Sequence, residues 1–191
     1  MKAIETSYKG YRFRSRTEAR WAIFFDTVGV SYQYEPEGFD LGEHGCYLPD
    51  FRIPSVNVWV EIKGVPPTDH EFEIAFSLHE QETGYKDSDP ATLYCLYGRM
   101  RDLIAERSPT RLQDAIAAPK MIILCGSPGD NLESHMVTRR DSTMRLFSIK
   151  DHMIPDLVSS LGGNTEKVHD AISKSRAARF EFEDSQKPWR K

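Results

Sequence analysis

The sequence predicts a mixed α/β fold, and three observations carry this prediction. A capping motif followed by an apolar stripe at helical spacing predicts a helix from about residue 15 to residue 29. Residues 56–63, VNVWVEIK, combine alternation with branched side chains and predict a strand. The predicted elements then follow in the order helix, several strands, helix, strand, which indicates a sheet packed against helices.

The first predicted helix has a clear beginning and end. Ser15 to Glu18 match the S-x-x-E capping box, and Gly29 ends the segment as a C-cap would. Residues 8–13 before it alternate aromatic and polar side chains, which predicts a short strand or an extended arm. Four apolar residues lie at helical spacing on the face that we expect to pack on the sheet: Trp21, Phe24, Phe25 and Val28.

The middle of the chain alternates strand patterns with turn residues. We expect strands over 30–35, 39–41, 46–51 and 56–63, and a helix over about 69–82. Pro54-Ser55 predicts the turn between the last two strands, which are therefore expected to pair as antiparallel neighbours.

The second half is less regular. We expect strands over 91–98, 121–126 and 145–149, short helices between 99 and 118, and a last helix from Asn164-Thr165 to about Phe180. The CGSPGD segment at 125–130 lacks the G-K-[ST] ending of a phosphate-binding loop, so we interpret it as a turn.

Composition points to a globular protein of one domain, or of one domain with an appendage. The chain has 191 residues, of which 39% are hydrophobic and 28% charged. No apolar run approaches the roughly 18 residues of a membrane-spanning helix, and the N-terminus has no apolar leader. Three widely spaced cysteines indicate reduced thiols. We therefore expect a cytoplasmic protein with no membrane partner.

Charge is distributed unevenly along the chain. The net charge is −4, yet residues 1–20 carry six basic and two acidic side chains. Residues 35–90 carry thirteen acidic and three basic side chains. An acidic centre beside basic ends suits metal binding flanked by phosphate contacts, although solvated faces of different charge explain it equally well.

The stretch YLPDFRIPSVNVWVEIKG, residues 47–64, places charge within a predicted hairpin. Side chains alternate across a strand, so Val56, Val58, Val60 and Ile62 share the face expected toward the core, and Asn57, Trp59, Glu61 and Lys63 share the other. The antiparallel return brings Asp50 opposite the Trp59–Glu61 region. Two carboxylates and one ammonium should converge on one patch.

Such a patch suits phosphodiester hydrolysis. Two carboxylates supply hard oxygen ligands for Mg²⁺, with Mn²⁺ as a substitute. A nearby lysine can orient or deprotonate the attacking water, or stabilise the charge of the transition state.

Pro49-Asp50 followed by Glu61-Ile62-Lys63 resembles the PD-(D/E)XK nuclease superfamily. The wider sequence is similar to a group of small phage and actinobacterial proteins of this superfamily over roughly residues 8–82, 120–126 and 170–182. The resemblance implies a restriction-endonuclease-like α-β-β-β-α-β core with a mixed sheet flanked by helices, plus a C-terminal helix. It also implies a nuclease-like domain over 1–160 with insertions at about 83–118 and 127–150, and a C-terminal helix with a basic tail over 161–191.

The resemblance further implies the roles of individual residues. Asp50, Glu61 and the Ile62 carbonyl would bind the metal, with Glu18 as an added ligand, and Lys63 would be the catalytic lysine. The expected activity is Mg²⁺-dependent endonuclease cleavage of DNA by in-line attack of water, in a bacterial or phage-infected cell. A homodimer or a larger protein assembly would suit double-strand cutting.

Simpler interpretations stand beside these. Glu18 fits the capping box as well as a metal site. The arginines considered for phosphate contacts are equally explained as solvated charges: Arg14, Arg16, Arg20 and Arg52. The six histidines have neither HExxH nor zinc-finger spacing, so no zinc site is expected. The alternative functions are a non-cleaving nucleic-acid-binding or assembly protein that retains the nuclease fold, and a purely structural α/β domain.

Overall fold

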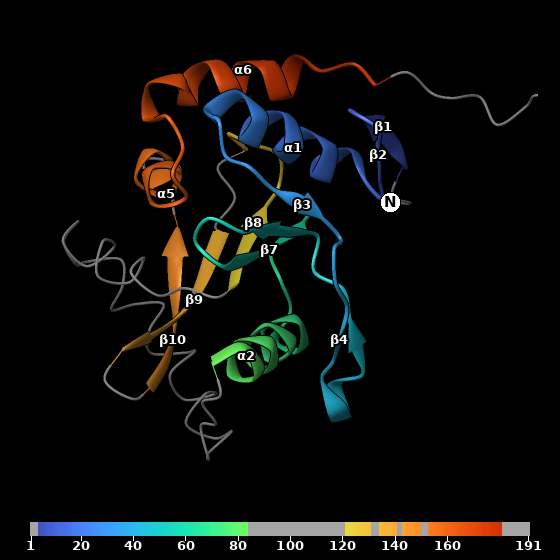
Figure 1. The fold of residues 1–191 in the computed structure, drawn as a ribbon, viewed down its shortest axis with the longest axis vertical. Coiled ribbons are helices and arrows are strands. Elements are labelled where there is room, and N and C mark those ends of the chain that lie inside the picture. Colours follow the sequence, from blue (N-terminus) through green and yellow to red (C-terminus); the bar gives the residue numbers. More distant parts are fainter. Residues whose placement is uncertain (1–3, 84–120, 131–133, 141–142, 150–152, 181–191) are drawn as a thin grey trace, which may run out of the picture.

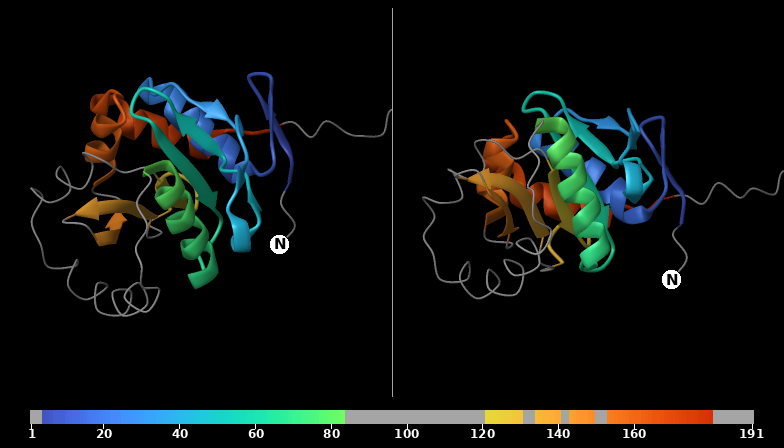
Figure 2. Two further views of the ribbon diagram at one scale, coloured as in Figure 1. Left: turned by 60° about the horizontal axis from the view of Figure 1, so that its bottom comes forward. Right: turned by 90° about the horizontal axis from the view of Figure 1, so that it is seen from below.

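The computed structural model describes residues 4–83, 121–130, 134–140, 143–149 and 153–180. In this part of the chain one six-stranded sheet lies between two layers of helices, as Figure 1 shows. Helix α1 (Arg16–Val28) and helix α6 (Val168–Ala177) cover one face, and helix α2 (Asp69–Thr83) lies on the other. Figure 2 shows the same separation from below. The predicted mixed α/β fold with a mixed sheet flanked by helices is confirmed.

The central sheet is mixed in strand direction. Its order is β10-β9-β8-β7-β6-β3, in which β7 and β8 are parallel and every other neighbouring pair is antiparallel. The strands are β3 (Gln33–Tyr34), β6 (Phe51–Ile53), β7 (Val58–Lys63), β8 (Met121–Cys125), β9 (Ser134–Arg140) and β10 (Thr143–Ile149). The predicted antiparallel hairpin of residues 47–64 therefore forms through β6 and β7.

Helix α1 follows the prediction closely. The Glu18 N–H donates to Ser15 Oγ at 3.2 Å, and Gly29 adopts a left-handed φ of 78° after the last turn. The predicted apolar stripe is buried against the sheet. Before the helix, β1 (Thr6–Tyr8) and β2 (Tyr11–Phe13) form a separate antiparallel hairpin.

Several predicted strand boundaries are wrong. The strand expected over 46–51 is split, because β5 (Cys46–Tyr47) pairs with β4 (Phe39–Asp40) outside the central sheet, whereas β6 begins at Phe51. Pro49 lies at the break and has no N–H to donate to a ladder. The strand expected from residue 56 begins at Val58, because Asn57 has a left-handed φ of 56° in the preceding turn. Of the strand expected over 30–35, only β3 forms.

Both faces of β7 are covered. Val58, Val60 and Ile62 pack in the core beneath α1 and α6, as predicted. Trp59, on the opposite face, is also buried in a second core that includes Phe72 and other residues of α2. Glu61 and Lys63 thus project from the α2 side of the sheet at the end of β7, beyond an apolar core rather than on an open polar face.

The C-terminal region contributes to the first core. Helix α5 (Ile154–Ser160), which the sequence did not predict, is followed by the 3₁₀ helix η3 (Thr165–Lys167) and by α6. Asn164 Oδ1 accepts from the Glu166 N–H, so the predicted start is correct, but the segment comprises two short helices and α6 ends at Ala177. Val168 and Ala171 of α6 pack in the same core as α1.

Strands β9 and β10 pair as antiparallel neighbours and widen the sheet. Only the strand over 145–149 was predicted, and it is longer than expected; β9 was not predicted. The buried strand predicted over 121–126 is confirmed as β8, and the turn predicted after it forms between Ser127 and Asp130. The elements predicted over 91–98 and 99–118 lie outside the described residues.

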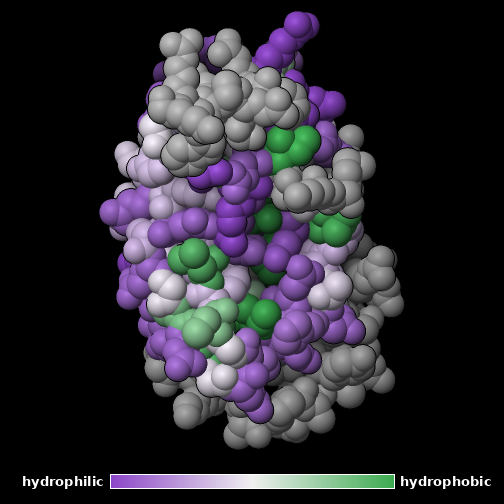
Figure 3. Space-filling model, turned by 90° about the vertical axis from the view of Figure 1, so that its right-hand side faces the viewer, coloured by the Kyte–Doolittle hydropathy of each residue, from purple (hydrophilic) through white to green (hydrophobic). Residues whose placement is uncertain are grey.

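The face of the molecule that carries β4 is mostly hydrophilic, as Figure 3 shows. Figure 3 shows hydrophobic side chains as separate spots on the face that carries β4. The exposed large hydrophobic side chains come from separate segments: Ile4, Tyr11, Leu48, Val56 and Val65. Scattered residues of this kind are ordinary for globular surfaces. No helix among the described residues has the length and apolarity needed to cross a membrane.

Candidate active site

Three carboxylates converge where β6, β7 and the start of α1 meet. Asp50, Glu61 and Glu18 are 3%, 7% and 6% exposed. The register of β6 and β7 pairs Phe51 with Val60, which places Asp50 beside Glu61 as the hairpin predicted. Buried carboxylates are rare unless they are paired or bind a metal, so this cluster marks a candidate site.

Asp50 is held from two sides. Its Oδ2 accepts from the Ile62 N–H at 2.7 Å, and its Oδ1 accepts from Arg14 Nη2 at 3.0 Å. Burial raises the pKa of Asp50 well above its usual value, and the nearby Glu61 and Glu18 carboxylates raise it further. The two hydrogen bonds oppose this shift without cancelling it. The positive charge near Asp50 is thus too small to offset its burial and the repulsion from the neighbouring carboxylates.

Glu18 has a backbone N–H that belongs to the helix cap and a carboxylate that lies at the cluster. Its backbone N–H completes the cap at Ser15, while its carboxylate accepts from the Arg14 N–H at 3.0 Å and from the Tyr34 hydroxyl at 2.7 Å. In a full capping box this carboxylate would accept from the Ser15 N–H instead. The side chain is therefore directed toward Asp50, whose pKa it raises.

Lys63 lies between two carboxylates. Its Nζ is 2.9 Å from Glu61 Oε1 and 3.0 Å from Glu71 Oε1 on α2. Burial opposes the charge on the ammonium, but Glu61 and then Glu71 outweigh burial and raise the pKa of Lys63. The raised pKa favours the ammonium form of Lys63.

The structure adds residues that sequence reasoning missed. The Tyr47 hydroxyl donates to Glu61 Oε2 at 2.8 Å, and Glu35 forms an ion pair with Arg14. Glu71 was readable as a helix-start residue, because Thr68 to Glu71 also match a capping box, but no sequence pattern linked it to Lys63. These partners come from separate segments, and only folding brings them together.

The four arginines fall in different places. Arg14 lies at the site and pairs with Asp50 and Glu35, and 53% of its side chain is exposed. Arg16 lies half-buried in the first turn of α1. Arg20 donates to Ser127 Oγ at 3.0 Å. Arg52 has its guanidinium 4.6 Å from the Trp59 ring and 3.8 Å from Glu82 Oε2.

The donor set suits a hard divalent cation. The cluster brings together more carboxylates than cations: Glu18, Glu35, Asp50, Glu61 and Glu71 against Arg14 and Lys63. Carboxylate oxygens are the ligands that Mg²⁺ and Mn²⁺ prefer. A divalent cation near Asp50 and Glu61 would offset the repulsion that raises the pKa of Asp50, so these residues fit such an ion.

No family model, no curated protein and no solved structure matches the chain. Function must therefore be argued from the site itself.

Proposed function

We propose that the protein is a Mg²⁺-dependent DNA endonuclease of the PD-(D/E)XK type. The observation that carries the proposal is the cluster of three buried carboxylates beside an ammonium, with the pKa of Asp50 raised by burial and by the neighbouring carboxylates. Perturbed titration of this kind concentrates at functional sites.

The order of the elements supports the proposal. Among the described elements, α1 is followed by β3, β6 and β7 of the central sheet, then by α2, and then by β8 parallel to β7. This is compatible with the α-β-β-β-α-β core expected from the motif. The position of Glu61 near the end of β7, with Asp50 beside it, further supports the proposal.

Each residue has a role in the proposed reaction. Asp50, Glu61 and the Ile62 carbonyl would hold the cation, with Glu18 completing the acidic side. When bound, Mg²⁺ would supply Lewis-acid chemistry, lowering the pKa of water and neutralising charge on the phosphate. Lys63, fixed by Glu61 and Glu71, would donate to the phosphate oxygen on which negative charge grows. Arg14, at the exposed rim, would donate to a neighbouring phosphate.

The test is cleavage of plasmid, linear, branched and single-stranded DNA with Mg²⁺, with Mn²⁺ and with EDTA. We expect metal-dependent cleavage by the wild type, and losses of about 100-fold or more in Asp50→Asn and Lys63→Ala. Asp156→Asn and Lys167→Ala are matched controls, because both side chains are exposed on other elements, and they should cleave like the wild type.

Cleavage that survives both site variants would overturn the proposal, as would a wild type that cuts none of these substrates. Gel-shift binding of DNA without cleavage would favour the non-cleaving alternative instead.

A further inference from the structure

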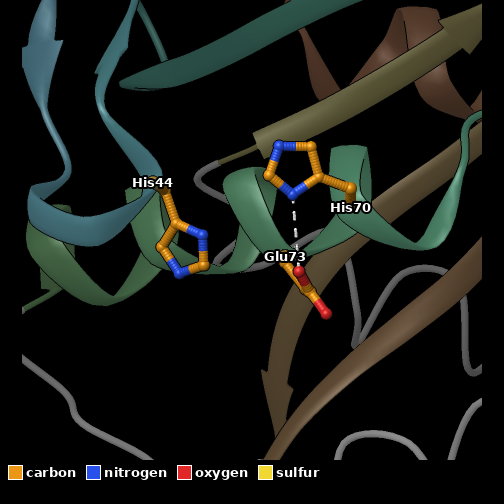
Figure 4. Close-up of side chains that lie close together, drawn as sticks. All are labelled: His44, His70 and Glu73. Carbon is orange, nitrogen blue, oxygen red and sulfur yellow. Dashed lines mark ion pairs between the residues drawn. The ribbon is translucent and has the colours of Figure 1, made fainter.

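A second cluster of metal-ligating side chains lies apart from the three carboxylates. It consists of His44, His70 and Glu73, which Figure 4 shows side by side. One ligand atom from each of the three lies within 4.8 Å of the other two. The pattern HExxH is absent, and the two histidines are far apart in sequence, which explains why spacing alone did not reveal the cluster.

The fold brings these residues together from two elements. His70 and Glu73 are three residues apart near the start of α2, so they project on the same side of the helix. His44 ends the 3₁₀ helix η1 (Gly42–His44) in the loop between β4 and β5, and this loop contacts α2. The His44 and His70 rings are 6.3 Å apart between centroids, and His70 Nδ1 is 3.5 Å from Glu73 Oε2.

The chemistry of the three ligands favours a transition-metal ion over Mg²⁺. Two imidazoles and one carboxylate are a donor set typical of Zn²⁺, whereas Mg²⁺ prefers oxygen ligands and retains water. Tetrahedral bonds of about 2.0–2.1 Å put ligand atoms about 3.3 Å from one another, so the three atoms must approach one another by at most about 1.5 Å. The side chains of His70 and Glu73 are 67% and 53% exposed, so rotation about their side-chain bonds can supply this closure.

We propose that His44, His70 and Glu73 bind one Zn²⁺, with water as the fourth ligand, and thereby clamp the β4–β5 hairpin onto the start of α2. The two clamped elements carry Tyr47 and Glu71, which contact Glu61 and Lys63. Zinc would thus stabilise the positions of two residues that support the carboxylate cluster. The proposal does not depend on nuclease activity.

The test is isothermal titration of EDTA-treated, dialysed protein with ZnCl₂ at pH 7.5. We expect one Zn²⁺ per chain in the wild type. Even changes beside a metal ligand cost roughly 10- to 100-fold in affinity, so His44→Ala, His70→Ala and Glu73→Gln should each lose at least about tenfold. His169→Ala is the matched control, because His169 is exposed on α6, and it should bind like the wild type.

Thermal unfolding provides a second readout. Zn²⁺ should raise the Tm of the wild type and of His169→Ala but not that of His70→Ala, since a ligand that binds the folded state stabilises it. Binding should weaken in acidic solution, because imidazoles bind metal only when neutral.

The proposal is wrong if the wild type binds no Zn²⁺, or if His70→Ala and Glu73→Gln bind it with wild-type affinity. If His44→Ala still binds Zn²⁺ while His70→Ala and Glu73→Gln do not, His44 is not a ligand. The proposed link between the β4–β5 hairpin and α2 would then be wrong. Binding that disappears in Asp50→Asn but persists in the histidine variants would place zinc at the carboxylates and would also overturn the proposal. None of these results requires DNA cleavage, so failure here is distinguishable from failure of the nuclease assignment.

Discussion

Asp50 is the residue on which the carboxylate cluster depends. It lies just before β6, with one oxygen fixed by the Ile62 N–H and the other by Arg14. These contacts hold it beside Glu61 and Glu18, where burial and repulsion both oppose its ionisation. An ionised Asp50 at this position therefore lowers the free energy of unfolding near neutral pH unless a cation compensates. Carboxylates with a perturbed pKa of this kind are common at functional sites.

This argument predicts how stability depends on pH in the absence of metal. The pKa of Asp50 is raised in the folded state, so between its unfolded and folded values the folded protein binds more protons. The contribution of Asp50 is fully favourable below the unfolded pKa and is lost as pH rises through the folded pKa. The free energy of unfolding should therefore fall, relative to Asp50→Asn, as pH rises from acidic to neutral.

The measurement is urea unfolding in EDTA across this pH range. Asp156→Asn, exposed on α5, serves as the control and should run parallel to the wild type. If the free energies of unfolding of the wild type and of Asp50→Asn change in parallel with pH, the pKa of Asp50 is not raised in the folded protein and the prediction is wrong.

At the scale of elements, the two helices that frame the cluster start differently. Helix α2 has a reciprocal capping box, in which the Thr68 N–H donates to Glu71 Oε2 at 2.7 Å and the Glu71 N–H donates to Thr68 Oγ1 at 3.4 Å. Helix α1 has only half of one, because the Glu18 carboxylate turns to Arg14 and Tyr34. In both helices the glutamate of the capping box, Glu18 or Glu71, also faces the cluster. The starts of α1 and α2 therefore position two of its charged groups.

Removal of the α2 cap should destabilise the protein modestly. Thr68→Ala deletes the hydroxyl that accepts from the Glu71 N–H, and loss of such a cap costs about 1 kcal/mol. Chemical denaturation measures the change. Thr165→Ala, an exposed threonine in η3, is the comparison and should stay within about 0.5 kcal/mol of the wild type. Equal stabilities for the two variants would contradict a capping role for Thr68.

At the scale of the whole molecule, the C-terminal segment closes the core over α1. The Asn164 N–H donates to the Val28 carbonyl at 2.7 Å, which links the end of α1 to the turn before η3 and α6. Gly163 lies in this turn, and a Cβ there would be 2.8 Å from both Val158 Cγ1 and Val30 Cγ2. The chain approaches the core so closely that only glycine fits.

Gly163→Ala should accordingly destabilise the fold by about 1–3 kcal/mol, because two buried valines cannot move apart without disturbing the core. Gly64→Ala is the matched control, since a Cβ at Gly64 meets nothing within 4 Å. Thermal and urea unfolding of the two variants provide the comparison. A Gly163→Ala protein as stable as Gly64→Ala would show that the turn can open without cost.

Local patterns predicted much of the fold, and long-range pairing decided the rest. The Ser15 cap, the Gly29 end and the helix over about 69–82 were correct, because caps and helical periodicity act within a few residues. The strand over 46–51 was wrong because pairing partners, not propensity, decide where a short strand ends. Strand β9 and helix α5 were not predicted, since their sequences carry no strong periodic signal.

The sequence by itself determined the mixed α/β class and the alternation that brings Asp50, Glu61 and Lys63 to one place. Period-2 geometry is a property of the backbone and needs no tertiary information. Only the tertiary structure decided that the charged face is covered by α2, that Glu71 and Tyr47 join it, and that His44 meets His70 and Glu73. These contacts join segments that are far apart in the sequence. A local sequence pattern does not indicate which distant segment a residue will contact in the folded protein.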